Sequence, residues 1–151
     1  MFSSKAIRVA AFAAASLFTA AASAQTGKPA EIKIGITTFL SGPASVFGVP
    51  AKAAADMYIE QINAAGGIKG VKIVPVYIDE GVGGDKFLSE YRRLVQEQGV
   101  KTMLSAISSG NCNIVAPVAE DLKVLNVMWD CGTEKVLEEK RYRYVVRTQA
   151  N

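Results

Sequence analysis

Apolar and polar residues alternate from Ile32 to Thr37, which is the two-residue period of a β-strand. The turn-forming residues Leu-Ser-Gly-Pro follow at positions 40–43, and a helical pattern then extends from Val49 to Ala65. A strand, a short turn and a helix are the first part of a βαβ unit. The turn lies at the carboxyl end of the strand, which is the edge where open α/β sheets bind ligands.

The helix predicted over residues 49–65 has an apolar face and a polar face. Its apolar positions recur at helical spacing, namely Ala51, Ala54, Ala55, Tyr58, Ile59, Ile62 and Ala65. The opposite face carries Lys52, Asp56, Glu60 and Asn63. The pair Gly66-Gly67 supplies the left-handed residue with which a helix commonly ends.

The same alternation of strand and helix continues along the chain. Further strands are predicted over residues 71–79, 101–107, 124–129 and 144–147. Helices are predicted over residues 85–99 with Asp85 as N-cap, from Asn111 or Asn113 to Leu122 with Pro117 near the first turn, and over residues 133–139 with Thr133 as N-cap. Five strands alternating with four helices predict an α/β fold with a doubly wound parallel sheet. Pro75 cannot donate to a ladder, so its strand should lie at a sheet edge, as the second strand does in the flavodoxin-like order 2-1-3-4-5.

Residues 1–24 have the pattern of a secretory signal peptide, with Lys5 and Arg8 before a short apolar run and Ala-Ser-Ala at its end. The alternative is a membrane anchor, but the run is shorter than the roughly 20 apolar residues that span a bilayer. We therefore expect export to the periplasm and a mature domain of residues 25–151.

The mature domain is nearly neutral, because 15 of the 17 basic side chains remain against 14 acidic ones once Lys5 and Arg8 are removed. No basic stripe with interleaved aromatic residues occurs, so we expect no nucleic-acid partner. The sequence has no histidine, the commonest general base and metal ligand. We predict no metal site, no cofactor and no catalytic residue. The two cysteines, Cys112 and Cys131, predict a disulfide in an exported chain, with two free thiols as the alternative.

Hydroxyl side chains gather after the third and fourth strands, where Ser108, Ser109 and Thr133 each lie near a helix N-terminus. Hydroxyl and backbone N–H groups there can bind an anion. The alternative is ordinary helix capping, for which serine and threonine are favoured. The acids Asp79 and Glu80 are interpreted as solvated loop residues, and Gly81 to Gly84 as a flexible loop.

Four motifs occur in order along the chain: Ser-Gly-Pro at 41–43, Ile-Asn-Ala-Ala-Gly-Gly at 62–67, Ala-Pro-Val-Ala-Glu at 116–120 and Tyr-Val-Val-Arg-Thr at 144–148. With these motifs the chain resembles the amino-terminal lobe of a solute-binding protein of an ABC importer, of the leucine/isoleucine/valine-binding type. The resemblance implies a type I periplasmic fold and a monomer that binds a small carboxylate-bearing solute and delivers it to a permease. It also implies a ligand site formed by Ser109 with Ser108 and Gly110, by Cys131, Gly132 and Thr133, and by Phe47.

This sequence departs from the family at Trp129, Asp130 and Cys131, where small residues and Ser/Thr-Pro are usual. An aromatic or other organic acid therefore fits the expected site as well as a branched-chain amino acid does. The chain ends where the family crosses into a second lobe, which we interpret as a fragment. Two alternatives stay open: a sensory or regulatory module with the same lobe, and a secreted enzyme using Asp79, Glu80 or Asp130.

Overall fold

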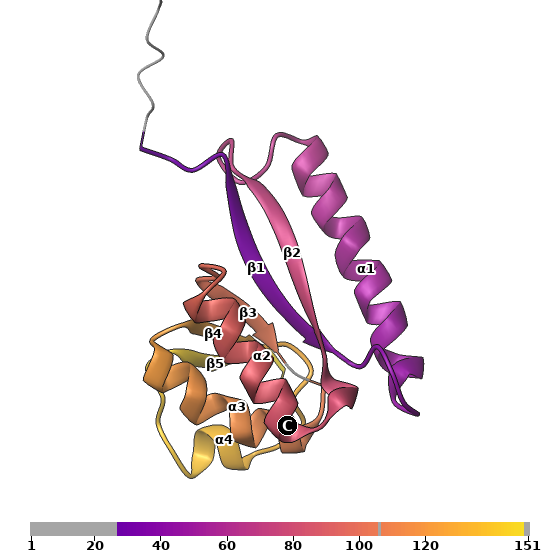
Figure 1. Cartoon of the computed structure of the whole chain (residues 1–151), viewed down its shortest axis with the longest axis vertical. Helices are drawn as coiled ribbons and strands as arrows, with labels where there is room; N and C mark the ends of the chain where they lie inside the picture. The colour runs from indigo at the N-terminus through magenta and orange to yellow at the C-terminus, as the bar shows by residue number, and fades with distance from the viewer. Residues whose placement is uncertain (1–26, 106, 150–151) are drawn as a thin grey trace, which may run out of the picture.

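The computed structural model of the chain describes residues 27–105 and 107–149. Its centre is a five-stranded parallel sheet in the order β2-β1-β3-β4-β5 (Figure 1). The strands are β1 Glu31–Thr38, β2 Lys72–Asp79, β3 Thr102–Ser105, β4 Leu125–Met128 and β5 Val145–Arg147. The predicted fold class and strand order are confirmed. The predicted signal peptide, residues 1–24, lies outside the described residues.

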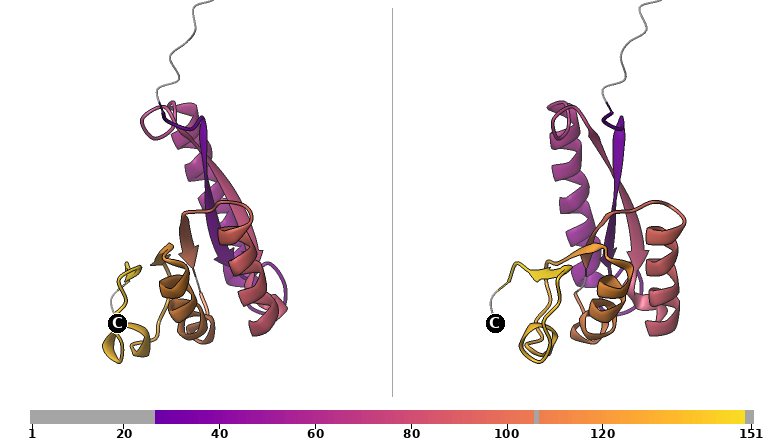
Figure 2. Two further views of the ribbon diagram at one scale, coloured as in Figure 1. Left: turned by 60° about the vertical axis from the view of Figure 1, so that its left-hand side comes forward. Right: turned by 90° about the vertical axis from the view of Figure 1, so that its left-hand side faces the viewer.

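Helices cover the two faces of the sheet unequally. The helices are α1 Ser45–Ala64, α2 Gly84–Gln96, α3 Ser109–Leu122 and α4 Lys135–Glu138, and a 3-10 helix, η1, spans Glu80–Val82. The turned views show α1 on one side of β1 and β2, with α2 and α3 on the other side (Figure 2). Among the described helices, none is both long enough and apolar enough to cross a bilayer.

The edge position that Pro75 predicts for the second strand is confirmed. Pro75 lies in β2, which pairs with β1 alone and forms one edge of the sheet. Because proline has no N–H, it can occupy a strand that needs hydrogen-bond partners on only one side.

Helix starts were predicted less well than strands. The helix α1 begins at Ser45, one turn before the predicted Val49. Ser108 caps α3, which starts at Ser109 and contains Pro117 in its interior rather than in its first turn. The N-cap residues of α2 and α4 are Gly83 and Glu134.

The predictions that Asp85 and Thr133 are N-caps are therefore wrong. The loop predicted over residues 81–84 is also not a plain loop, since η1 occupies its first half.

The helix α1 packs with part of its predicted apolar face and with two residues that the sequence pattern assigned to solvent. Ala51, Ala55 and Ile59 are half-buried as predicted. Asp56 accepts a hydrogen bond of 2.6 Å from the Tyr77 hydroxyl of β2, and Asn63 bonds both the N–H and the carbonyl of Ile73 at 2.8 Å. The apolar Tyr58 is 61 % exposed. The reason lies in β2, because the outer backbone groups of an edge strand require polar partners.

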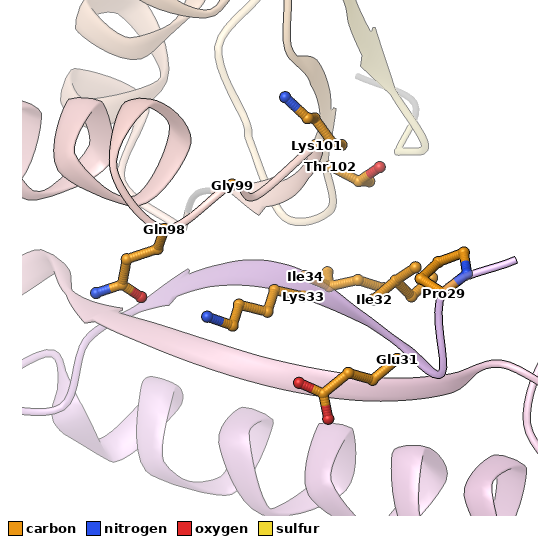
Figure 3. A pocket seen from close by; sticks show the side chains of 9 residues that line it. All are labelled: Pro29, Glu31, Ile32, Lys33, Ile34, Gln98, Gly99, Lys101 and Thr102. Carbon is orange, nitrogen blue, oxygen red and sulfur yellow. The ribbon is translucent and has the colours of Figure 1, made fainter. Parts of the chain in front are cut away.

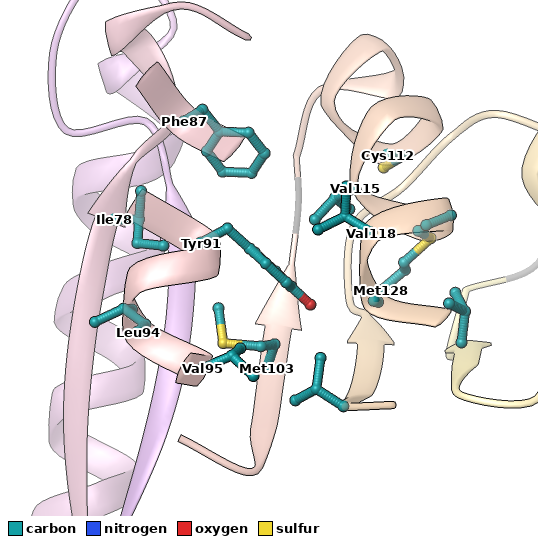
Figure 4. Packing of buried hydrophobic residues seen from close by; sticks show 14 of the residues in the cluster. Ile78, Phe87, Tyr91, Leu94, Val95, Met103, Cys112, Val115, Val118 and Met128 are labelled. Atoms are coloured by element: carbon teal, nitrogen blue, oxygen red, sulfur yellow. The ribbon is translucent and has the colours of Figure 1, made fainter. Parts of the chain in front are cut away.

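The core lies between the sheet and the pair α2 and α3 (Figure 4). Its largest fully buried side chains include Tyr91, Phe87, Leu94, Met103 and Met128. The Tyr91 hydroxyl donates to Asn126 Oδ1 at 2.8 Å, and Ser105 Oγ donates to the same atom at 2.7 Å. Burial raises the pKa of Tyr91. This core holds β3, β4 and α3 in place, and these elements carry the candidate site.

Candidate functional site

The carboxyl ends of all five parallel strands meet at one edge of the sheet, at the end where α1, α2 and α3 begin (Figure 1). Every sequence-predicted site residue lies in a loop or first helical turn at this edge. In open α/β sheets this edge is the usual position for a ligand.

The first turn of α3 provides the exposed part of the site. Ser109 and Gly110 are exposed, whereas Ser108 is half-buried. Ser108 Oγ accepts a hydrogen bond from the N–H of Asn111 at 3.3 Å, and its carbonyl accepts one from the N–H of Cys112 at 2.9 Å. Ser108 is thus the N-cap, and it leaves the Ser109 hydroxyl at the surface.

A disulfide brings the next loop to this turn. Cys112 and Cys131 are linked, as the sequence predicted, with Cα atoms 6.3 Å apart, which lies within the usual range for a disulfide. Both cysteines are fully buried. Beyond the bridge, a Cβ added to Gly132 would lie 3.9 Å from Ser109 Oγ. Ser109 and Gly132, which belong to different loops, are therefore neighbours.

Thr133 is held from the end of β5. Its carbonyl accepts a hydrogen bond of 2.5 Å from Arg147 Nη1. Arg147 is not among the site residues predicted from sequence, although a cationic residue at the carboxyl end of the last strand was a usable signal. The guanidinium carries five N–H donors, so this contact does not exhaust its capacity.

Phe47 lies at the same edge but on a different element. It is in the first turn of α1 and is 67 % exposed. The adjacent Gly48 contacts the end of β1, where a Cβ would lie 2.0 Å from the Phe39 carbonyl oxygen. In the described part of the chain, no hydrogen bond or disulfide joins the first turn of α1 to α3. The position of Phe47 is thus fixed by β1 rather than by the other site residues.

The two acids at the carboxyl end of β2, Asp79 and Glu80, are structural, so their interpretation as solvated loop residues is wrong. Asp79 Oδ1 accepts hydrogen bonds from the backbone N–H groups of Leu40 at 2.8 Å, Ser41 at 3.2 Å and Gly81 at 2.8 Å. Burial acts to raise the pKa of Asp79, but hydrogen bonds from the Ser41 side chain and these N–H groups outweigh it and lower the pKa. Glu80 is 3 % exposed and contacts the loop after β3.

A hollow of about 530 Å³ lies at the opposite end of the sheet (Figure 3). It occurs because β1 begins three residues before Ile34, the residue that pairs with the first residue of β3. Side chains of Ile32, Gln98 and Lys101 line it. None of the sequence-predicted site residues lies there.

The described residues contain no group of three or more histidine, cysteine or acidic side chains that could hold a metal ion. The edge instead offers hydroxyl groups, backbone N–H groups of a 14-residue helix and one guanidinium. Such groups suit an anion.

A doubly wound sheet with these groups at its carboxyl edge is characteristic of an α/β ligand-binding domain. Residues 31–151 match the family described as periplasmic binding protein. The chain belongs to this family, whose members are binding proteins rather than enzymes, as the sequence predicted.

The curated relatives that match this chain are described more specifically, as binding proteins for leucine, isoleucine and valine or as homologs of such proteins. The chain is 28% identical over 118 residues to the Leu/Ile/Val/Thr-binding protein of Salmonella typhimurium, an alignment that covers 78% of this chain and 32% of the relative. It is 32% identical over 99 residues to Leu/Ile/Val-binding protein homolog 3 of Brucella melitensis, covering 66% of this chain and 26% of the relative. The chain thus spans about a third or less of the length of these relatives.

Solved structures share the fold. One is the branched-chain amino acid transporter substrate-binding protein of Streptococcus pneumoniae in complex with isoleucine, with a TM-score of 0.70 at 24% identity, covering 78% of this chain and 33% of that one. Another is a solute-binding protein of an ABC transporter from R. palustris in complex with 4-hydroxybenzoate. Its TM-score is 0.68 at 25% identity, covering 79% of this chain and 32% of that one.

Proposed function

We propose that residues 25–151 form the amino-terminal lobe of a substrate-binding protein of an ABC importer. In this proposal residues 1–24 direct export to the periplasm, and the protein acts as a monomer that delivers its solute to a permease. The observation that carries the proposal is the family match over residues 31–151. The gathering of exposed polar groups at one sheet edge supports it.

The solute would bind through a carboxylate at the N-terminus of α3. The first N–H groups of a helix have no partner within it, and the helix dipole adds positive potential at this end. The Ser109 hydroxyl and the N–H of Gly110 would contact the carboxylate from α3, and Gly132 and Thr133 would contact it from the neighbouring loop.

Two classes of carboxylate fit the proposed site. The Salmonella relative is described as binding leucine, isoleucine, valine and threonine, and the R. palustris protein was solved with 4-hydroxybenzoate. Phe47, which is 67 % exposed at the same edge, and the half-buried Trp129 would suit an aromatic ring. We propose an amino acid or an aromatic acid as the solute.

An NMR titration of the isotopically labelled chain tests this function. Isoleucine and 4-hydroxybenzoate, added to millimolar concentration, are expected to shift the amide signals of Ser109, Gly110, Gly132 and Thr133. The double substitution Ser109→Ala and Thr133→Ala should weaken this binding by about tenfold, or about 1.4 kcal/mol. Ser89→Ala removes an exposed hydroxyl from α2 and should change nothing.

Two results would contradict the proposal. Shifts confined to the hollow near Gln98 and Lys101 would put the ligand at the wrong end of the sheet. An unchanged affinity in the double variant would leave Ser109 and Thr133 without a role in binding.

A further inference from the structure

Glu80 is the one charged residue among the described residues that is buried, with 3 % of its surface exposed. It follows β2 directly and is the first residue of η1. A buried carboxylate is costly unless hydrogen bonds replace its water. The partners of Glu80 therefore show which parts of the fold depend on it.

Four donors surround this carboxylate, and they come from two segments other than its own. Thr37 Oγ1 in β1 donates to Oε1 at 2.9 Å. The N–H of Ile107 lies 3.0 Å from Oε1 and 3.2 Å from Oε2. The N–H of Ser108 and Asn111 Nδ2 donate to Oε2 at 3.2 Å and 3.0 Å.

The chemistry of this arrangement favours a carboxylate over other side chains of similar size. Three of the four partners are N–H groups and can only donate, whereas an ionised carboxylate only accepts. The ion pairs found in the described part of the chain join Lys52 to Asp56 and Arg93 to Glu90, not Glu80. Hydrogen bonds and the N-terminus of α3 thus hold its charge.

Three of the five contacts fix the backbone that leads into α3. The N–H groups of Ile107 and Ser108 follow the end of β3, where the ladder no longer pairs them. By accepting from them, Glu80 holds Ser108 where it can cap α3. The helix then begins at Ser109, and the hydroxyl of Ser109 lies beside Gly132.

We infer that Glu80 is a positioning residue of the candidate site: through Ile107, Ser108 and Asn111 it fixes the turn that presents Ser109 to a solute carboxylate. This inference rests on the proposed function for the role of Ser109. Its structural half, that Glu80 orders residues 107–111, stands separately.

A competing effect must be separated from positioning. Glu80 is negative and contacts the same helix end as the proposed solute carboxylate, so it also repels that solute through space. Loss of its charge would tighten binding if repulsion dominated, and would weaken binding if positioning dominates. The direction of the change therefore distinguishes the two effects.

Amide hydrogen exchange of the Glu80→Gln variant tests the structural half without any ligand. In this variant the amide side chain at position 80 would turn its own N–H₂ group toward N–H donors, so some of their hydrogen bonds would be lost. Amide exchange at Ile107 and Ser108 should therefore accelerate by about tenfold or more. Exchange at Tyr91 and Met103 in the core should stay as in wild type. Glu97→Gln makes the same change at an exposed position and is the matched control.

The double variant Glu80→Gln, Asn111→Asp exchanges the amide and the carboxylate across one hydrogen bond. It should recover part of the protection at Ser108, which a general loss of stability would not allow. Unchanged exchange at Ile107 and Ser108 in the single variant would overturn the inference. So would acceleration spread evenly over the core, with no recovery in the double variant.

The functional half is read from the NMR titration with isoleucine and 4-hydroxybenzoate. Glu80→Gln should weaken binding of whichever probe binds the wild-type chain by about tenfold, with partial recovery in the double variant. Equal or tighter binding would overturn the positioning role. If neither probe binds the wild-type chain, the proposed function fails, and the exchange data still decide whether Glu80 orders the turn.

Discussion

Asp79 anchors the first loop to η1, because a single oxygen accepts hydrogen bonds from the N–H groups of Leu40, Ser41 and Gly81. These bonds lower its pKa in the folded state against the opposing effect of burial. A lowered folded-state pKa contributes stability above the unfolded value of about 3.9, and this contribution is lost as the pH falls through the folded value.

Asp79→Asn should therefore destabilise the chain at pH 7 and should reduce the loss of stability on acidification below about pH 4. Urea unfolding at a series of pH values measures both effects. Asp121→Asn, at an exposed position, serves as the control. An unchanged pH profile in Asp79→Asn would mean that these bonds do not depend on the charge.

Gly48 allows α1 to begin close to the end of β1. A Cβ at this position would lie 2.0 Å from the Phe39 carbonyl oxygen and 2.6 Å from its backbone nitrogen. Backbone atoms cannot yield as a flexible side chain can, so Gly48→Ala should destabilise the chain by about 1–3 kcal/mol. The higher helix propensity of alanine, worth about 1 kcal/mol, works against this loss.

Thermal or urea unfolding measures the effect of Gly48→Ala. Gly132→Ala is the control, because its methyl group would lie 3.9 Å from Ser109 Oγ, an ordinary contact. A Gly48→Ala variant as stable as wild type would show that α1 can move away from Phe39 at little cost.

At the scale of elements, the disulfide joins the first turn of α3 to the loop after β4. Its two cysteines are 19 residues apart in sequence, and closing a loop of this size is worth about 3 kcal/mol in the chain-entropy model. Cys112→Ala with Cys131→Ala should lower the free energy of unfolding by about that amount. It should also broaden the NMR signals of Gly132, since the bridge holds that loop beside α3.

Thiol titration of the denatured, non-reduced chain checks the disulfide itself and should find no free thiol. Ser109→Ala is the control for the Gly132 signals. It removes the hydroxyl beside Gly132 but keeps the disulfide, so it separates the effect of losing that contact from the effect of losing the disulfide. Two titratable thiols in exported protein would contradict the disulfide.

The strands could be predicted from sequence because their signals are local. The alternation from Ile32 to Ile36 and the proline at position 75 sufficed for β1 and for the edge position of β2. The pairing of Cys112 with Cys131 could be predicted because the chain has two cysteines and was expected to be exported.

Features that depend on distant partners could not be predicted in this way. Several residues from Ser108 to Asn111 are of types that can cap a helix equally well. The residue that does so in the structure is Ser108, whose N–H donates to Glu80, 28 residues away in sequence. The polar residues Asp56 and Asn63 of α1 pack because they bond to the edge strand β2, and no pattern within α1 reveals these contacts. Sequence reasoning missed Glu80 because an acid after a strand commonly lies in solvent.

For the whole molecule, the sheet is covered on one face more fully than on the other. On the face that carries α1, the side chains of Ile32, Leu125 and Val146 are 37%, 43% and 45% exposed. Parallel sheets usually have both faces covered. This open face and the coverage of 32% of the Salmonella relative agree with the proposal that the chain is one lobe of a larger binding protein.

The affinity of the 151-residue chain should consequently be low. Two or three hydrogen bonds to a carboxylate contribute about 0.5–3 kcal/mol each, and association itself costs at least about 4 kcal/mol. Micromolar binding requires about 8 kcal/mol and millimolar binding about 4 kcal/mol. We therefore predict that this chain binds isoleucine or 4-hydroxybenzoate no better than millimolar.

A protein of the relatives' full length that carries this lobe should bind the same solute at micromolar or tighter, because burial of the solute between two lobes supplies the remainder. Calorimetry on the full-length protein and the NMR titration of the chain give the two affinities. In both, the double substitution Ser109→Ala and Thr133→Ala should cost about tenfold. Micromolar binding by the chain alone would show that this lobe holds more of the site than its carboxyl edge provides.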